Sequence, residues 1–200
     1  MRKKLTLILL VVVVFALTGV GFFVFRSHQA KKPVAKLTAV KAEAKPAEAA
    51  PVKAETKDHL VIDKTGVNAK VVSVGVTKEG NMDVPGNIYD VGWYSKGAKL
   101  GAKGTAVLAG HLDNAGGEPG VFAKLKDLVA GDVVKIVSPD GNEIRFKVTK
   151  TKLYGAADKP TEVFTSSSGA HLNLITCTGS WDKNKSQYDK RLVVFTELTK

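Results

Sequence analysis

The stretch that decides the fold is residues 132–151, which read DVVKIVSPDGNEIRFKVTKT. Two runs rich in β-branched residues, 132–138 and 142–151, flank a Pro-Asp-Gly turn at 139–141, and this combination predicts a β-hairpin. From 144 to 148, apolar residues alternate with Arg and Lys. One face of this strand should therefore lie in the core while the other meets water.

Strand-like runs recur on both sides of this hairpin. They cover residues 67–77, 105–111, 171–176 and 192–198. Only residues 121–129 show helical spacing, with apolar side chains at Phe122, Leu125 and Leu128/Val129. Several short strands with regular turns and one or two small helices predict an all-β fold closed into a barrel.

The first 26 residues differ sharply from this domain. Residues 5–25 form an uncharged run of 21 residues that follows Arg2, Lys3 and Lys4. As a helix this run would span about 31 Å, which matches the hydrocarbon core of a bilayer. Residues 1–26 are therefore predicted to be a signal anchor, with a cleaved signal peptide as the alternative.

Residues 27–58 are predicted to be a disordered linker, because their Ala, Lys, Pro and Glu content cannot bury enough apolar surface to fold. The folded domain is expected at 59–200. The net charge of the chain is +11, but residues 60–200 hold 19 Lys/Arg against 15 Asp/Glu, and no basic cluster interleaved with aromatic residues. This distribution argues against nucleic-acid binding and favours a membrane surface or an anionic cell wall.

Cys177 is the only cysteine, so neither an intrachain disulfide nor a cysteine-based zinc site can form. No Asp/Glu run has the spacing of an EF-hand loop, and neither a metal nor a cofactor is expected. A lone cysteine is often a small buried apolar residue. Here, however, it follows the apolar run Asn173-Leu174-Ile175-Thr176 and precedes Thr-Gly-Ser, so it stands where a strand opens into a loop. That setting favours a reactive thiol.

A thiol that attacks an acyl group needs a proton partner, and the chain has four histidines. His28 and His59 fall in or beside the linker. His171 shares a strand with Cys177 but lies about 20 Å away along it. His111 ends a different strand, in Ala109-Gly110-His111-Leu112-Asp113, and can meet Cys177 if both strands end at the same rim. A surface histidine in a turn is the alternative.

Arg191 is the candidate for stabilising a developing negative charge. It opens the last predicted strand, so if that strand pairs with the one carrying Cys177, residues 178–190 form the connecting loop and Arg191 returns beside the thiol. A guanidinium stays charged and presents several donors in a fixed fork. Such donors suit an oxyanion that forms in a transition state.

These residues resemble the sortases, and most closely their class F. The likeness runs through the Thr-Cys motif, the upstream Gly-His-x-Asp, the Arg before an apolar strand, and further pieces in order along the chain. Those pieces are Pro85-Gly86-Asn87, Val91-Gly92-Trp93-Tyr94, Pro119-Gly120-Val121-Phe122 and Leu128-Val129-Ala130-Gly131-Asp132. One departure is Thr178-Gly179, where the group commonly has Gly-Gly.

The resemblance implies an eight-stranded barrel outside a Gram-positive-type cell and cleavage of a Leu-Pro-x-Thr-Gly-like sorting signal between Thr and Gly. Cys177 would form a thioacyl intermediate, His111 would act as general acid and base, and Arg191 would bind the oxyanion or the substrate backbone. The acyl group would pass to a cell-wall amine. Thr176 would lie in the substrate groove.

Two further residues, Asp113 and Trp93, are predicted substrate contacts. Asp113, with Asn114, could instead shape the histidine turn, and Trp93 could instead pack in the core. Other functions stay open: a peptidase that uses water, or a non-enzymatic wall-binding module. A peptidoglycan L,D-transpeptidase, with its Ser-His-Gly-Cys signature, fits poorly because Leu174-Ile175-Thr176 precedes Cys177.

Overall fold

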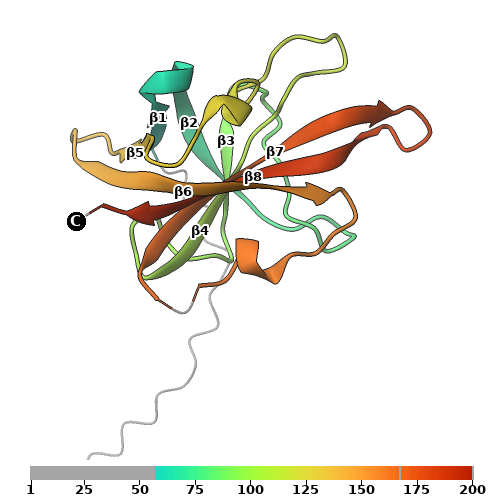
Figure 1. Cartoon of the computed structure of the whole chain (residues 1–200). Coiled ribbons are helices and arrows are strands. Elements are labelled where there is room, and N and C mark those ends of the chain that lie inside the picture. The colour runs from blue at the N-terminus through green and yellow to red at the C-terminus, as the bar shows by residue number, and fades with distance from the viewer. Residues whose placement is uncertain (1–56, 167, 200) are drawn as a thin grey trace, which may run out of the picture. The chain divides into compact units, whose positions relative to one another are not determined.

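The computed structural model describes residues 57–166 and 168–199, and within them eight strands close into a barrel (Figure 1). The strands are β1 (His59–Ile62), β2 (Val67–Val74), β3 (Val91–Tyr94), β4 (Gly104–Ala109), β5 (Val133–Val137), β6 (Glu143–Gly155), β7 (Ala170–Asp182) and β8 (Gln187–Leu198). Around the barrel the order is β1-β2-β3-β4-β7-β8-β6-β5, and β5 pairs with β1 to complete the ring. The predicted all-β closed barrel is confirmed.

The hairpin predicted from residues 132–151 is β5–β6. Val137 pairs with Glu143 in an antiparallel ladder, and the turn between them is closed by Gly141, whose backbone adopts φ +84°. Phe146 and Val148 are buried, while Arg145 and Lys147 are exposed. The alternation therefore identifies the core face of this strand correctly.

Two strands have no counterpart in the sequence prediction, and two others are longer than expected. β1 and β3 have only four residues each. β7 continues to Asp182 and β8 begins at Gln187, so most of the expected loop at 178–190 is a β-ribbon. Figure 1 shows this ribbon reaching well beyond the other strands. The expectation of an open loop was wrong because the ladder continues from Cys177 and Arg191 to Asp182 and Gln187.

The expected helix at 121–129 is also wrong. This segment holds only a three-residue 3-10 turn, η2 (Leu125–Asp127), and the other turns of this kind are η1 (Asp63–Thr65) and η3 (Thr161–Val163). The apolar spacing marks core contact, since Phe122 and Leu125 are buried. The backbone bonds within this segment join residues three apart, as from Leu125 to Phe122 and from Leu128 to Leu125, which is the pattern of turns and 3-10 helix and not of an α-helix.

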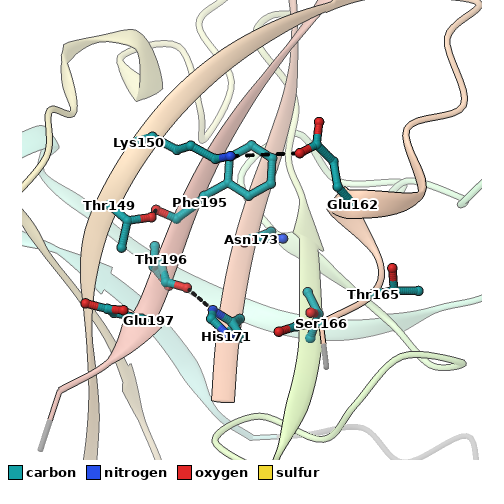
Figure 2. Close-up of a pocket in the computed structure, with 11 residues that line it drawn as sticks. Thr149, Lys150, Glu162, Thr165, Ser166, His171, Asn173, Phe195, Thr196 and Glu197 are labelled. Atoms are coloured by element: carbon teal, nitrogen blue, oxygen red, sulfur yellow. Dashed lines mark hydrogen bonds and ion pairs between the residues drawn. The ribbon is translucent and has the colours of Figure 1, made fainter. Parts of the chain in front are cut away.

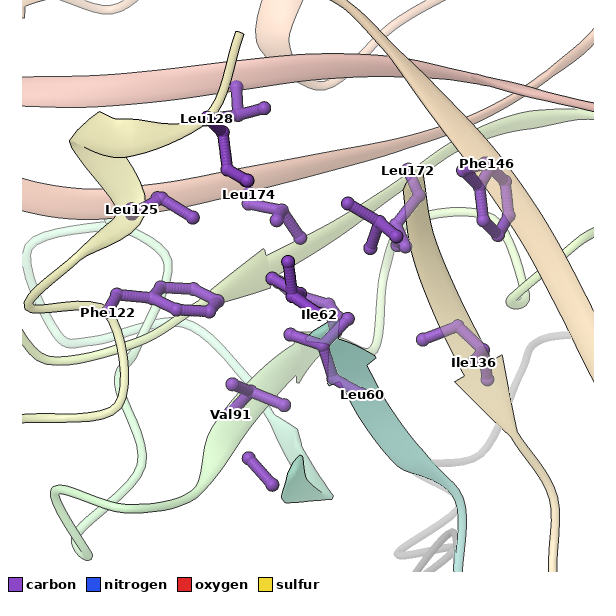
Figure 3. Packing of buried hydrophobic residues seen from close by; sticks show 14 of the residues in the cluster. Leu60, Ile62, Val91, Phe122, Leu125, Leu128, Ile136, Phe146, Leu172 and Leu174 are labelled. Carbon is purple, nitrogen blue, oxygen red and sulfur yellow. The ribbon is translucent and has the colours of Figure 1, made fainter. Parts of the chain in front are cut away.

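The barrel interior is filled by apolar side chains from all eight strands and from the 121–128 segment, and Figure 3 shows many of them meeting at the centre. The largest fully buried ones include Phe122, Phe146, Leu60, Ile62 and Leu174. Close packing of this kind fixes the strand ends relative to one another. The rims of the barrel are therefore rigid platforms for side chains that do chemistry.

The predicted anchor at 1–26, and the predicted linker up to residue 56, lie outside the described residues. In the part of the chain that the structure does describe, no helix has the length and apolar character needed to cross a membrane.

Candidate active site

Parallel pairing of β4 with β7 brings His111 beside Cys177. The ladder runs from Gly104 opposite Ala170 to Ala109 opposite Ile175. Beyond it, the N–H of Gly110 donates to the carbonyl of Ile175 at 3.1 Å. Continued by two residues, the same register sets His111 opposite Cys177. His111 and Cys177 therefore lie at the same rim of the barrel, as their predicted meeting requires.

Antiparallel pairing of β7 with β8 brings Arg191 to the other side of the thiol. Cys177 and Arg191 are direct cross-strand partners, so their side chains project from the same face of the sheet. The Nη1 of Arg191 donates to the carbonyls of Tyr188 and Lys190, both at 2.9 Å. These bonds occupy both hydrogens of Nη1 and leave the donors on Nε and Nη2 for another partner.

The electrostatics of the thiol are set by three effects. Burial raises the pKa of Cys177, the positive charge of Arg191 lowers it, and the negative charge of Asp113 raises it again. The net result is a pKa above the ordinary value for a cysteine. The resting thiol therefore holds its proton, and a nearby base is needed to remove it during reaction.

Close backbone packing holds the turn that carries His111. A Cβ on Gly120 would lie 2.5 Å from the carbonyl oxygen of His111, so only glycine permits this approach. The same carbonyl accepts from the N–H of Phe122 at 2.9 Å, and Phe122 is anchored in the core. The Nε2 of His111 donates to the carbonyl of Pro85 at 2.8 Å, because a carbonyl can only accept. This bond leaves Nδ1 as the nitrogen that can exchange a proton.

The structure places the other predicted residues as follows. Thr176 is buried, and its hydroxyl donates to the carbonyl of Gly110 at 2.9 Å, which ties β7 to the histidine turn. Trp93 packs against the core, and its Nε1 donates to the carbonyl of Ala98. Asp113 lies close enough to Cys177 to influence its charge. Their predicted role in substrate binding stays a prediction.

The other described histidines lie away from this group. His171 sits near the start of β7, opposite Thr105, and its two ring nitrogens lie 3.0 Å from the carbonyl of Thr196 and 2.7 Å from that of Ser168. His59, on β1, contacts the Asn68 side chain. Strand geometry thus separates His171 from Cys177, as the spacing predicts.

Sequence reasoning missed Tyr188. Its hydroxyl donates to the Asp113 carboxylate at 2.5 Å, and its ring makes an edge contact with Trp181 at 5.2 Å. The available signal was a pair of aromatic residues flanking the polar turn around Asn184, which is typical of a cross-strand pair in a hairpin.

A cleft of about 360 Å³ lies at the other end of β7, around His171. Figure 2 shows Lys150 and Glu162 facing each other across the Phe195 ring, with Asn173 and His171 below them. Because Cys177, His111 and Arg191 are not among its lining residues, this cleft is separate from the candidate active site.

Comparison with known proteins places the chain in a family. A family model described as a sortase domain matches residues 60–199. No curated protein matches the chain. The fold is similar to that of Listeria monocytogenes sortase A (TM-score 0.56, 20% identity, 74% of this chain and 89% of that one). It is also similar to a Clostridium perfringens sortase D5 transpeptidase (0.55, 20%, 72% and 79%) and to Streptococcus agalactiae sortase C1 (0.57, 20%, 73% and 68%).

The barrel and the family comparison agree: Cys177 pairs with Arg191, and β4, which leads to His111, runs beside β7 toward the same rim. The chain belongs to the sortase family of cysteine transpeptidases.

Proposed function

We propose that this protein cleaves a Leu-Pro-x-Thr-Gly-like sorting signal between Thr and Gly and transfers the upstream protein to a cell-wall amine. The observation that carries the proposal is the convergence of three strand ends. Cys177 pairs directly with Arg191, and the β4–β7 register leads His111 to the same place. A nucleophile, a proton carrier and a cation within one site are the groups that acyl transfer needs.

In the first half-reaction His111 takes the thiol proton through Nδ1, and the sulfur of Cys177 bonds to the carbonyl carbon of the substrate Thr. Arg191 stabilises the oxyanion through the Nε and Nη2 donors that its backbone contacts leave available. The Thr–Gly bond then breaks as His111 returns the proton to the leaving amine. The acyl group remains on Cys177 as a thioester.

In the second half-reaction an acceptor amine attacks the thioester carbonyl. His111 removes a proton from the amine, the new amide bond forms as the carbon–sulfur bond breaks, and His111 passes the proton to the sulfur to restore the thiol of Cys177. Because the pKa of Cys177 is raised, the resting protein holds a neutral thiol, and transfer of its proton to His111 belongs to the attack itself.

Membership of class F and a domain outside the cell rest on the sequence resemblance. A single-pass membrane anchor in residues 5–25 rests on the length of their uncharged run. Asp113, Trp93 and Thr176 are retained as proposed contacts or supports of the substrate groove. The ribbon from 178 to 190 departs from the class pattern at its start, where Thr178-Gly179 replaces the common Gly-Gly. We propose that this difference affects which sorting signals the protein prefers.

The test uses the purified full chain in detergent with a Leu-Pro-x-Thr-Gly peptide, with and without a small primary amine. Products are identified by mass. We expect cleavage between Thr and Gly, an amine adduct when the amine is present, and a thioester on Cys177 that is trapped at low pH.

Three outcomes would contradict this proposal in different ways. Cleavage that persists in Cys177→Ala would rule out the thiol mechanism. A product that is always the free acid, even at high amine concentration, would identify a peptidase. A folded protein that cleaves no sorting-like peptide would favour a wall-binding module. Ser138→Ala, in the distant β5–β6 turn, is the matched control and should keep full activity.

A further inference from the structure

The loop after His111 and the β7–β8 ribbon are joined by one side-chain hydrogen bond. The hydroxyl of Tyr188 donates to Oδ2 of Asp113 at 2.5 Å, across 75 positions of sequence. Asp113 stands two residues after His111, and Tyr188 stands three residues before Arg191. The bond therefore connects the segments that carry the proton carrier and the cation.

Tyr188 also contacts Arg191 directly. Its backbone carbonyl accepts a hydrogen bond from Nη1 of Arg191 at 2.9 Å. A single residue thus holds the guanidinium with its carbonyl and the histidine loop with its hydroxyl. We propose that Tyr188 is a positioning residue that, through Asp113, fixes His111 and Arg191 relative to Cys177. The inference rests on the proposed transpeptidation and identifies the residue that aligns its catalytic groups.

Parts of both joined segments extend beyond the barrel core. The β7–β8 ladder changes register between Thr178 and Trp181, at the point where the ribbon leaves the barrel. Gly179 there has φ +90°, a conformation typical of a bulge. On the other side, residues 115–119 of the histidine loop are exposed. Among the described residues, the Tyr188–Asp113 hydrogen bond joins the two segments through their side chains.

The ring of Tyr188 is itself held in place. It meets Trp181 on the facing strand in an edge contact, with 5.2 Å between ring centroids and 75° between their planes. Its hydrogen bond to Asp113 raises the pKa of Tyr188, so the hydroxyl remains a donor at neutral pH. The hydroxyl is therefore positioned by the ring contact and keeps its donor proton at neutral pH.

The Tyr188–Asp113 bond also holds the negative charge of Asp113 near the Cys177 thiol. The carboxylate of Asp113 raises the pKa of Cys177, while Arg191 lowers it. Both groups are held by Tyr188, one through the hydroxyl and one through the carbonyl. Loss of the hydroxyl would free Asp113 to move away from the thiol, with the ring contact to Trp181 retained.

The test compares Tyr188→Phe, Asp113→Asn and the double variant in the full chain. We expect Tyr188→Phe to lower kcat for peptide transfer about tenfold with KM changed less than twofold, as the loss of a hydrogen bond to a charged group predicts. Asp113→Asn keeps an acceptor oxygen and should lose less. Since both act through one bond, the double variant should be no slower than Tyr188→Phe.

The matched control is Tyr89→Phe. Tyr89 also donates to a carboxylate, that of Glu118, but among the described residues the Arg191 guanidinium bonds to Tyr188 and Lys190 and not to Tyr89. This variant should keep the kcat of the unaltered protein. Thermal unfolding of all variants separates positioning from general destabilisation, because a lowered kcat with unchanged unfolding temperature indicates positioning.

A second readout does not depend on peptide turnover. The rate of Cys177 alkylation by iodoacetamide, measured against pH, reports the pKa of the thiol. Asp113→Asn should move the midpoint to lower pH, and the shift should be smaller in the Tyr188→Phe background, where Asp113 is no longer held. Equal shifts in both backgrounds, or single losses of kcat that multiply in the double variant, would overturn the inference. Failure of the proposed function would instead abolish turnover while this coupling remained.

Discussion

The outer face of β7 has two ends of opposite chemical character. At one end stands Cys177, and at the other stands His171, six residues earlier on the same face. Both ring nitrogens of His171 contact backbone carbonyls, and buried Asn173 donates to the carbonyl of Val163 at 2.8 Å. At the Cys177 end, His111 has one ring nitrogen bonded among the described residues, to Pro85. The comparison indicates that the polar side chains at the stabilising end have hydrogen-bond partners, while the histidine proposed to carry out chemistry keeps one ring nitrogen available for a proton.

An apolar patch separates the two ends. Val163 of η3 packs against Val193 and Phe195 of β8, with Ile175 of β7 beside them. Ile175 lies between Asn173 and Cys177 on the outer face, because alternate residues of a strand share a face. This patch buries Asn173, so the hydrogen bond from Asn173 to the Val163 carbonyl is shielded from water.

The largest expected effect comes from replacing each of the two histidines by alanine and comparing the variants. His111→Ala should lower the rate of peptide transfer by about 10²–10⁴-fold, since it removes the proton carrier. His171→Ala should change that rate less than twofold. Rates are measured at saturating peptide, with product detected by mass.

His171→Ala should instead lower the free energy of unfolding, by about 1–3 kcal/mol, because it removes the imidazole that bridges the carbonyls of Ser168 and Thr196 and leaves one of them without its donor. Urea unfolding followed by circular dichroism measures this loss. A strong loss of activity with unchanged stability in His171→Ala would break the comparison between the two ends.

Arg191→Gln should produce the next largest effect. Removal of a preorganised charged donor at an oxyanion site costs about 10²–10³-fold in kcat. The positive charge of Arg191 lowers the pKa of Cys177, so its removal should raise that pKa further and move the midpoint of thiol alkylation to higher pH. Arg145→Gln, on the exposed face of β6, is the matched control. An unchanged alkylation midpoint in Arg191→Gln would contradict the electrostatic role.

Asn173→Ala should affect stability more than activity. The side chain is 3% exposed, and its amide satisfies the Val163 carbonyl under the apolar patch. Leaving that carbonyl unpaired in a buried position costs about 1–3 kcal/mol. Thermal unfolding measures the loss, and peptide cleavage at a temperature where the variant is folded should stay within about twofold. A loss of cleavage as large as that of Arg191→Gln would show that this end of β7 also takes part in catalysis.

The sequence predicts much of this arrangement where the signals are local. Alternation identifies β6, and the apolar run before Cys177 identifies the part of β7 that leads to the candidate thiol. It does not reveal β1 and β3, because four residues are too few to show a period. The β7–β8 ribbon is missed for another reason: beyond Cys177 it buries no apolar face, and it is held by cross-strand bonds and the Tyr188–Asp113 contact.

The same distinction holds within the site. Cys177, His111 and Arg191 each end or begin a predicted strand, so their residue types and positions suffice to propose them. Pro85 and Tyr188 enter through tertiary contacts from segments 26 and 75 residues away from their partners. No pattern along the chain specifies which carbonyl a histidine will meet, and these partners are therefore visible only in the folded protein.

The smallest expected effect tests whether surface charge contributes to the stable end. Glu162 lies over the His171 cleft, where its carboxylate accepts from Lys152 and Tyr154 and pairs with Lys150 at 3.8 Å. The hydrogen bond from Lys152, followed by that from Tyr154, lowers the pKa of Glu162 from its ordinary 4.5. Any stabilisation is therefore present above pH 4.5 and is lost as the pH falls through the lower value of the folded state.

Because Glu162 is exposed, water and salt screen these pairs. Glu162→Gln should shift the urea midpoint only slightly at pH 7, and the shift should vanish in high salt and at pH values below the folded pKa. A large, salt-independent loss would mean that exposed charge, and not the buried bonds of Asn173 and His171, stabilises this end of β7.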